Sequence, residues 1–323
     1  MLDLVSKRYI WFAISLIIII PGLIFLLMPG GGLRSGIDFS GGTLWEFVIP
    51  NRTETVSSAQ FVDIFEAQGL DISERDVLVS PPNAQQQAIV SVRTAEVATE
   101  DPKRQQIADA VGEDFAGATL SQFATVGATV SRESTQQAVL AVFAASLAIL
   151  GYLTFAFRKA PHPLRYGVCA VIAMLHDVLV VIGVAAILGY FIGLEIDALF
   201  LTALLTVISF SVHDTIVVFD RVRENLLHRR TGQAFEDVVN LSVVQTLTRS
   251  INTQLTTLLT LLALLMFGGQ SIRNFVLILL IGLLSGTYSS IFNAAQLLVV
   301  WENGWGRDWQ LARHRSSGTQ ATA

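Results

Sequence analysis

Three ionisable residues inside otherwise apolar stretches of this chain have the types and positions needed to move protons: Asp177, Asp214 and Arg249. A charged side chain at the centre of a membrane-spanning helix costs about 2.5–3.5 kcal/mol on insertion scales, so such residues face the bundle interior and mark ion pathways or relays. We predict a proton relay formed by Asp214 and Arg249. The alternatives are that Asp214 only fixes helix packing and that the Arg249 head group simply reaches the membrane surface.

Polar residues accompany both members of the predicted relay at helical spacing. One series, at intervals of 4, 3 and 4 residues, lies beside Asp214 and comprises Thr202, Thr206, Ser209 and His213. The other has the same intervals and comprises Arg249, Thr253, Thr256 and Thr260. Each series occupies one face of a helix. If the two helices are neighbours, movement of the Arg249 guanidinium changes the proton affinity of the Asp214 carboxylate.

A second His-Asp pair, His176-Asp177, repeats the order of His213-Asp214. The two pairs could extend the relay or support its polar face. Adjacent residues point about 100° apart on a helix, so at most one member of His176-Asp177 is expected to face a given partner. A purely structural role is the alternative. No two histidines are four residues apart, which argues against a helical metal site, and the sequence contains no recognisable hydrolase triad.

The last apolar stretch carries Gly282 and Gly286, a spacing of small residues that permits close helix approach. A polar series lies on the same stretch and comprises Ser285, Ser289, Asn293 and Gln296. We favour a role in bundle packing for both sets. A wetted cavity is the alternative.

A glycine-rich motif, Gly36-Ile-Asp-Phe-Ser-Gly-Gly-Thr43, contains Gly36, Asp38, Gly41 and Gly42. Glycines of this kind can cradle a phosphate, but a phosphate loop opens a helix. The residues that follow, Leu44 to Ile49, alternate as a strand does. We therefore expect a turn or bulge that starts a strand. A function beyond folding would be contact with another domain or hinging.

Composition identifies the class of protein that must position these residues. Of 323 residues, 15% are charged, against about 25% in average soluble proteins. Hydrophobic residues make up 52%, and the mean hydropathy is +0.56. These values indicate a polytopic membrane protein. The single cysteine, Cys169, excludes an intramolecular disulfide and a Cys-based metal site. The net charge of −5 argues against a nucleic-acid-binding protein, which would need a basic surface.

Six spans are predicted, because a bilayer core of about 30 Å needs about 20 helical residues. Four lack charged residues, and two retain one acid each. Their approximate ranges are 9–33, 134–157, 166–190, 198–219, 250–272 and 274–301. The first reads as an uncleaved anchor. Loops on the side of the termini hold 13 Lys and Arg, whereas the short alternate loops hold only Arg273, so both termini are expected in the cytoplasm.

This topology divides the chain into four parts. They are 1–28, the N-terminus and first helix; 29–136, an external domain; 137–300, helices 2–6 with a cytoplasmic interfacial helical segment at 221–248; and 301–323, a cytoplasmic tail. Periodicity in the external domain predicts β-α-β-β-α-β, the ferredoxin-like split unit. The predicted elements are strand 43–49, helix 56–68, strands 76–80 and 88–93, helix 102–115 and strand 118–128.

Three motifs resemble those of the SecD/SecF family of protein translocase subunits, in its SecF branch. They are Gly36 to Thr43, His213-Asp-Thr-Ile-Val-Val-Phe-Asp-Arg-Val-Arg-Glu-Asn225 and Gly286-Thr-Tyr-Ser-Ser-Ile-Phe292. The resemblance covers nearly the whole chain, and six helices with one external domain match the family's architecture. The family's intramembrane acid falls on Asp214. Its arginine, within a Gln-Thr-Leu-x-Arg pattern, falls on Arg249.

The resemblance implies an accessory role in Sec-dependent export, without covalent catalysis, cofactor or metal, driven with SecD by the proton motive force. Na⁺ coupling is an alternative. Implied partners are SecD, the SecY/SecE/SecG channel, YajC, YidC, the surrounding lipid of the cytoplasmic membrane and the unfolded polypeptide, held by the external domain. The competing hypotheses are a subunit of a proton-driven small-molecule exporter and a structural assembly subunit without ion coupling.

Overall fold

The computed structural model describes residues 2–28, 32–50, 56–80, 82, 86–158, 160 and 162–303, apart from the side chains of 270, 271 and 303. The chain divides into two compact units. One holds most of the helices, and the other comprises residues 34–139 together with 195–198. The two units are described separately.

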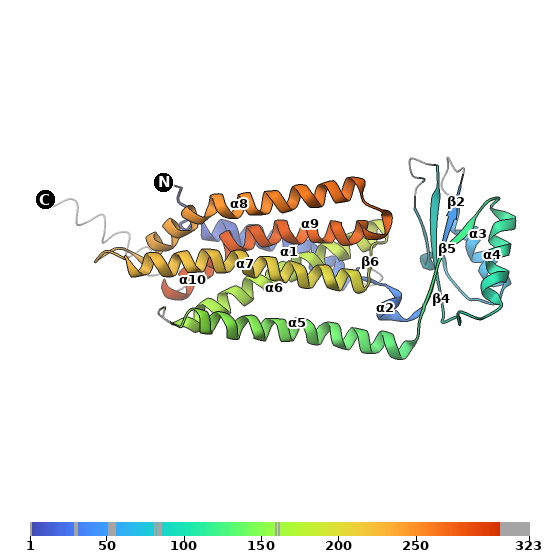
Figure 1. Ribbon diagram of the computed structural model, residues 1–323, viewed down its shortest axis with the longest axis horizontal. Coiled ribbons are helices and arrows are strands. Elements are labelled where there is room, and N and C mark those ends of the chain that lie inside the picture. Colours follow the sequence, from blue (N-terminus) through green and yellow to red (C-terminus); the bar gives the residue numbers. More distant parts are fainter. Residues whose placement is uncertain are drawn as a thin grey trace. The chain divides into compact units, whose positions relative to one another are not determined.

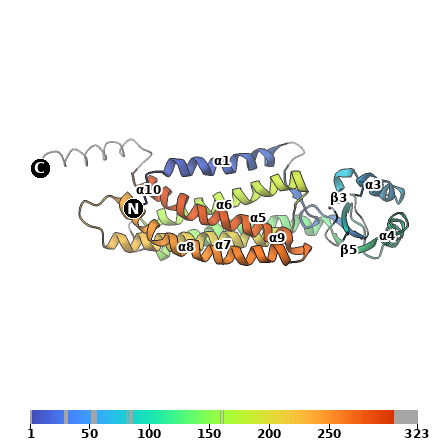
Figure 2. The same ribbon diagram turned by 90° about the horizontal axis from the view of Figure 1, so that it is seen from above.

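Within the described residues, six helical stretches are long and apolar enough to cross a membrane, which confirms the predicted number. The first five are α1 (Arg8–Leu27), α5 (Ala128–Ala156), α6 (Pro163–Ile192), α7 (Ala198–Leu227) and α8 (Phe235–Phe267). The sixth consists of α9 (Gln270–Ser289), a π-helical turn η2 (Ser290–Ala294) and α10 (Ala295–Asn303). Figures 1 and 2 show α8 and α9 side by side.

Helix α1 lies against α6, and a glycine on each helix allows the two backbones to approach closely. A Cβ atom on Gly22 would lie 2.5 Å from the Cα atom of Gly183, so neither position tolerates a side chain without a backbone shift. The sequence analysis did not single out this pair, because the two glycines are far apart in sequence and belong to no common motif.

The connection between α7 and α8 differs from the prediction of a separate interfacial helix at 221–248. Helix α7 extends to Leu227, and α8 begins at Phe235 and continues without a break through Arg249 to Phe267. No glycine or proline interrupts 235–267. The buried positions also follow one face through the expected boundary; they are Val238, Val239, Ser242, Val243, Thr246, Ser250 and Gln254. Arg249 is therefore internal to a long helix.

The second unit contains the predicted β-α-β-β-α-β order. Its elements are β2 (Gly42–Ile49), α3 (Ser58–Ala67), β3 (Val77–Val79), β4 (Ala88–Thr94), α4 (Lys103–Asp114) and β5 (Thr119–Val126), with a 3-10 turn η1 (Glu74–Asp76) before β3. The strands form an antiparallel sheet in the order β3-β4-β2-β5. Both helices cover the same face (Figure 1), where Trp45, Phe47 and Ile49 of β2 are fully buried or nearly so. This arrangement is the ferredoxin-like fold.

The glycine-rich motif forms a short helix, α2 (Ile37–Ser40), where we expected only a turn or bulge. It follows β1 (Arg34–Ser35), which pairs in parallel with β6 (Glu195–Ile196). Gly41 and Gly42 have φ values of 74° and 103°, and a Cβ atom on Gly42 would lie 2.5 Å from the carbonyl oxygen of Thr94. Both glycines are therefore required for the chain to turn from α2 into β2.

The motif also bonds to the residues that follow β6 within the same unit. The Asp38 carboxylate accepts a hydrogen bond of 2.9 Å from the backbone N–H of Ala198. Arg93 of β4 forms an ion pair with Glu195 and donates to the backbone oxygen of Ser35 at 2.6 Å. The short strands β1 and β6 are thus tied to the sheet by side chains as well as by their backbone pairing.

Candidate functional site

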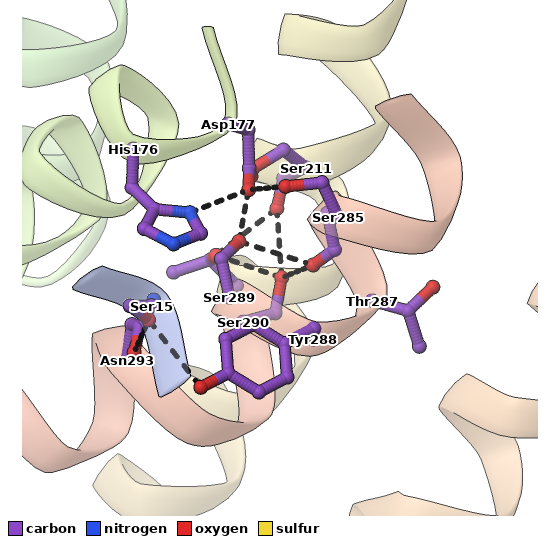
Figure 3. A network of polar contacts seen from close by, with 12 residues as sticks. Ser15, His176, Asp177, Ser211, Ser285, Thr287, Tyr288, Ser289, Ser290 and Asn293 are labelled. Carbon is purple, nitrogen blue, oxygen red and sulfur yellow. Dashed lines mark hydrogen bonds and ion pairs between the residues drawn. The ribbon is translucent and has the colours of Figure 1, made fainter. Parts of the chain in front are cut away.

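Asp177 is the centre of a polar network that joins α6, α7 and α9. Its side chain is fully buried, and its carboxylate has four hydrogen-bond partners (Figure 3). Ser211 of α7 and the α9 residues Ser285 and Ser289 each donate at 2.6 Å, and His176 lies at 3.0 Å. One carboxylate therefore joins α6 to two other helices.

The close packing of α9 on α7 brings these donors together. A Cβ atom on Gly282 would lie 2.1 Å from Val207 Cγ2, and one on Gly286 would lie 3.3 Å from the Cα atom of Ser211. Because glycine lacks a side chain, the two helices approach closely enough for Ser211 and Ser285 to bond the same carboxylate. The glycine pair thus determines which hydroxyls reach Asp177.

We expect replacement of Gly282 by alanine to destabilise the bundle, because its methyl group would overlap Val207 and push α9 away from α7. The expected loss is about 1–3 kcal/mol, measured as a lower midpoint of thermal unfolding in detergent. Gly151→Ala in α5 is the matched control, since nothing lies within 4 Å of its Cβ position. Equal midpoints for the two variants would contradict this assignment.

The network continues from Asp177 to η2 and α1. Ser290 Oγ donates to the backbone oxygen of Ser211 at 3.2 Å, and Thr215 Oγ1 donates to Ser290 Oγ at 3.2 Å. On the α1 side, Asn293 Nδ2 donates to Ser15 Oγ at 2.9 Å. Ser285, Ser289 and Asn293 of the predicted polar series thus serve helix contacts, whereas the buried Gln296 side chain has no hydrogen-bond partner among the described residues. The series passes through a π-helical turn, an element often found at functional sites.

The predicted partners Asp214 and Arg249 lie on neighbouring helices, but no ion pair joins them among the described residues. Asp214 is 3% exposed and instead accepts a hydrogen bond of 2.6 Å from Gln254 Nε2 on α8. Arg249 is exposed. Five residues separate Arg249 from Gln254, about 140° around the helix axis, which explains why only one of them faces α7.

Gln254 is the residue that the sequence analysis missed. A signal for it exists, because the buried polar residues of α8 recur every fourth position; they are Ser242, Thr246, Ser250 and Gln254. A second series of polar residues on α8, which starts at Arg249, has similar helical spacing and was predicted to face Asp214. That series lies on the exposed side of α8, where Thr253, Thr256 and Thr260 donate to backbone carbonyls of their own helix.

The predicted polar face of α7 behaves in the same way. Thr202, Ser209 and His213 are exposed, and Thr206 is half-buried and donates to the carbonyl oxygen of Thr202 at 2.8 Å. Asp214 lies beside this face but points into the bundle. We call these two series the polar face of the bundle. It comprises Thr202, Thr206, Ser209 and His213 of α7 and Arg249, Thr253, Thr256 and Thr260 of α8.

His176 and Asp177 have different neighbours on the other helices, as expected, but they also contact each other. The imidazole Nδ1 lies 3.0 Å from Asp177 Oδ1, so the two neighbouring side chains contact each other. Asp177 bonds hydroxyls of α7 and α9, whereas the His176 ring lies beside Tyr288 of α9, with the ring centroids 6.1 Å apart.

Comparison with known proteins identifies the family. The family described as "Protein export membrane protein SecD/SecF, C-terminal" matches residues 106–304, more than half of the chain. The chain belongs to the SecD/SecF family. The matched segment contains Asp177, Asp214, Arg249 and Gln254, whereas the glycine-rich motif precedes it.

Two curated SecD/SecF relatives differ in how much of their length this chain covers. "Protein translocase subunit SecF" of Thermobaculum terrenum is 52% identical over 316 residues, which cover 94% of this chain and 95% of that protein. "Protein translocase subunit SecDF" of Bacillus subtilis is 34% identical, and the alignment covers 93% of this chain but 38% of that protein.

The crystal structure of SecDF from Thermus thermophilus gives the corresponding structural match. It is 30% identical with a TM-score of 0.78, and the match covers 94% of this chain. This chain spans 39% of that longer chain. The fold of this chain is therefore that of one part of SecDF.

Proposed function

We propose that this chain is a SecF-type accessory subunit of the Sec protein translocase and works with a SecD-type partner. The SecF names of its relatives support this role. The longer SecDF proteins support the partner, because this chain corresponds to less than half of their length. The subunit resides in the cytoplasmic membrane with both termini inside, and residues 29–136 lie outside and hold emerging polypeptide.

The polar face of the bundle favours a partner chain inside the membrane. Arg249 is exposed on α8 just before the predicted span 250–272, where contact of its guanidinium with the hydrocarbon would be unfavourable. Threonine hydroxyls bonded to their own helix tolerate lipid, but a guanidinium does not. The SecD-type partner covers this face. The SecY/SecE/SecG channel, YajC and YidC complete the assembly.

The proton motive force drives this subunit through Asp214. The observation that carries this proposal is a buried carboxylate bonded across the helix interface to Gln254, with Arg249 on the same helix. Movement of the Arg249 guanidinium towards Asp214 changes the proton affinity of that carboxylate. One charge that crosses 100 mV supplies about 2.3 kcal/mol, so several protons per cycle suffice for a domain movement. No cofactor takes part.

We expect Asp214→Asn to abolish the stimulation of export by a proton gradient and to leave gradient-independent export unchanged. The assay uses proteoliposomes that contain this chain, its SecD-type partner and the Sec channel, with protease-protected preprotein as the readout. Asp220→Asn is the matched control, because Asp220 is an exposed acid of the same helix, paired with Arg223 at 2.7 Å.

Other outcomes of this assay assign the competing functions. Full gradient stimulation in Asp214→Asn would overturn the relay and leave a structural assembly subunit. Stimulation by a Na⁺ gradient but not by a proton gradient would change the coupling ion. Loss of export of a small cation dye, with preprotein export unchanged, would indicate a small-molecule exporter.

A further inference from the structure

We propose that His176 is a second proton-binding group in the helical bundle, that its Nε2 atom accepts the proton, and that Asp177 is its positioning residue. The proposal deepens the proposed function, because a proton-driven subunit needs protonatable groups inside the membrane. It rests on a different set of residues from Asp214 and Gln254.

The bonds to Asp177 determine the hydrogen position on the imidazole. Ser211, Ser285 and Ser289 donate three hydroxyl hydrogens to the carboxylate, and His176 takes the fourth position. An ionised carboxylate has about four acceptor sites and no donor. Nδ1 of His176 must therefore carry a hydrogen, and in the neutral ring Nε2 is left with a lone pair.

Nε2 of His176 is buried and has no hydrogen-bond partner in the part of the chain that the structure describes. The side chain is only 10% exposed. Nε2 is therefore the ring atom available to bind a proton. A proton bound there would form an imidazolium beside the Asp177 carboxylate, which would compensate its charge.

The neighbouring titratable groups do not satisfy Nε2. Tyr288 on α9 lies beside the imidazole, but its hydroxyl donates to the backbone oxygen of Trp11 at 2.5 Å. On α7 the nearest acid, Asp214, is bonded to Gln254. Residues 10–27 of α1 contain no titratable side chain, and η2 contains none. Among the described residues, His176 is the only ionisable side chain within ion-pair distance of Asp177.

Protonation of His176 would affect the packing of the helices that Asp177 joins. An imidazolium holds the Asp177 carboxylate more strongly than a neutral ring does, because the hydrogen bond becomes charge-assisted on both sides. That carboxylate also holds Ser211, which lies three residues before Asp214 on α7, and Ser289, which adjoins η2. The packing of α6 against α7 and α9 therefore responds to the proton on His176.

The direct test is ¹⁵N nuclear magnetic resonance of the full-length chain, labelled at histidine, in lipid nanodiscs across a pH series. The chain has five histidines, and His176→Gln assigns the resonance. We expect the Nδ1–H tautomer at neutral pH and conversion to the imidazolium on acidification. An Nε2–H tautomer, or a ring that stays neutral throughout the range in which the protein is folded, would overturn the proposal.

Variants test the positioning role of Asp177. Asp177→Asn is expected to remove the excess of the Nδ1–H tautomer, and Ser285→Ala provides a milder change if that variant does not fold. His213→Gln is the control, because His213 is exposed, and its loss should leave the His176 resonances unchanged. Unaltered tautomers in both Asp177→Asn and Ser285→Ala would show that Asp177 does not position the ring.

The spectroscopic result is independent of the export assay. If Asp214→Asn retains full gradient stimulation while His176 still titrates, the proposed function fails and this inference stands. If Asp214→Asn abolishes stimulation and His176 does not titrate, only this inference fails. In the export assay His176→Gln should shift the pH profile of the stimulated rate, whereas a purely structural role would lower the rate equally at every pH.

Discussion

Replacement of Asp177 by leucine is expected to lower the free energy of unfolding by about 3 kcal/mol, because the hydroxyls of the buried Ser211 and Ser289 and the half-buried Ser285 lose their shared acceptor. Each hydroxyl left without a partner costs about 1–3 kcal/mol. The estimate uses the lower end of that range, since Ser289 already has a second acceptor in the backbone oxygen of Gly286 at 3.2 Å. The measurement is unfolding of the purified chain in mixed detergent micelles.

The control for this effect removes the hydroxyls as well. When both partners of a buried hydrogen bond become apolar, the change is nearly neutral. The triple variant Asp177→Leu, Ser211→Ala, Ser285→Ala should therefore be more stable than Asp177→Leu alone. If the triple variant is instead the less stable of the two, the serines contribute by packing, and Asp177 does not account for their burial.

The fold was largely predictable because its signals are local. Strand β2 shows strict alternation of buried and half-buried residues, which the sequence displays as Trp45, Phe47 and Ile49. The spans follow from length and the scarcity of charge. The boundary between α7 and α8 was not predictable in this way, because charged residues such as Arg249 limit an apolar run without ending a helix.

The candidate site was only partly predictable, because its contacts depend on the rotation of each helix about its axis. Asp177 and Asp214 are evident from the sequence because each is the only acid in a long apolar stretch. Their partners do not, since Gln254 and Ser211 reach them only in one rotation and depth of α7 and α8. A threonine can bond its own helix at i−4, so a polar series at helical spacing does not identify the buried face. For this reason the spacing of the threonines predicted the wrong faces of α7 and α8.

A second large effect is expected at the ion pair between Arg8 and Glu236. Arg8 is 1% exposed, and its NH1 atom lies 3.0 Å from Glu236 Oε1. The sequence analysis took the Lys and Arg of this segment only as a topology signal, yet the pair joins the first residue of α1 to the first turn of α8. Glu236→Ala should lower the free energy of unfolding by up to about 3 kcal/mol, the lower end of the range for buried pairs, because Arg8 is buried whereas the Glu236 side chain is 19% exposed.

Two comparisons test whether burial is the cause. The exposed pair Arg223 and Asp220, at 2.7 Å, has the same chemistry, and Asp220→Ala should cost at most about 1 kcal/mol. The double variant Arg8→Met, Glu236→Leu should regain most of the stability lost in Glu236→Ala, because both members of the pair become apolar. If it does not, the segment is held mainly by Asn240 of α8, whose side-chain oxygen accepts from the backbone N–H of Leu4 at 2.9 Å. Asn240→Ala would then show the larger loss.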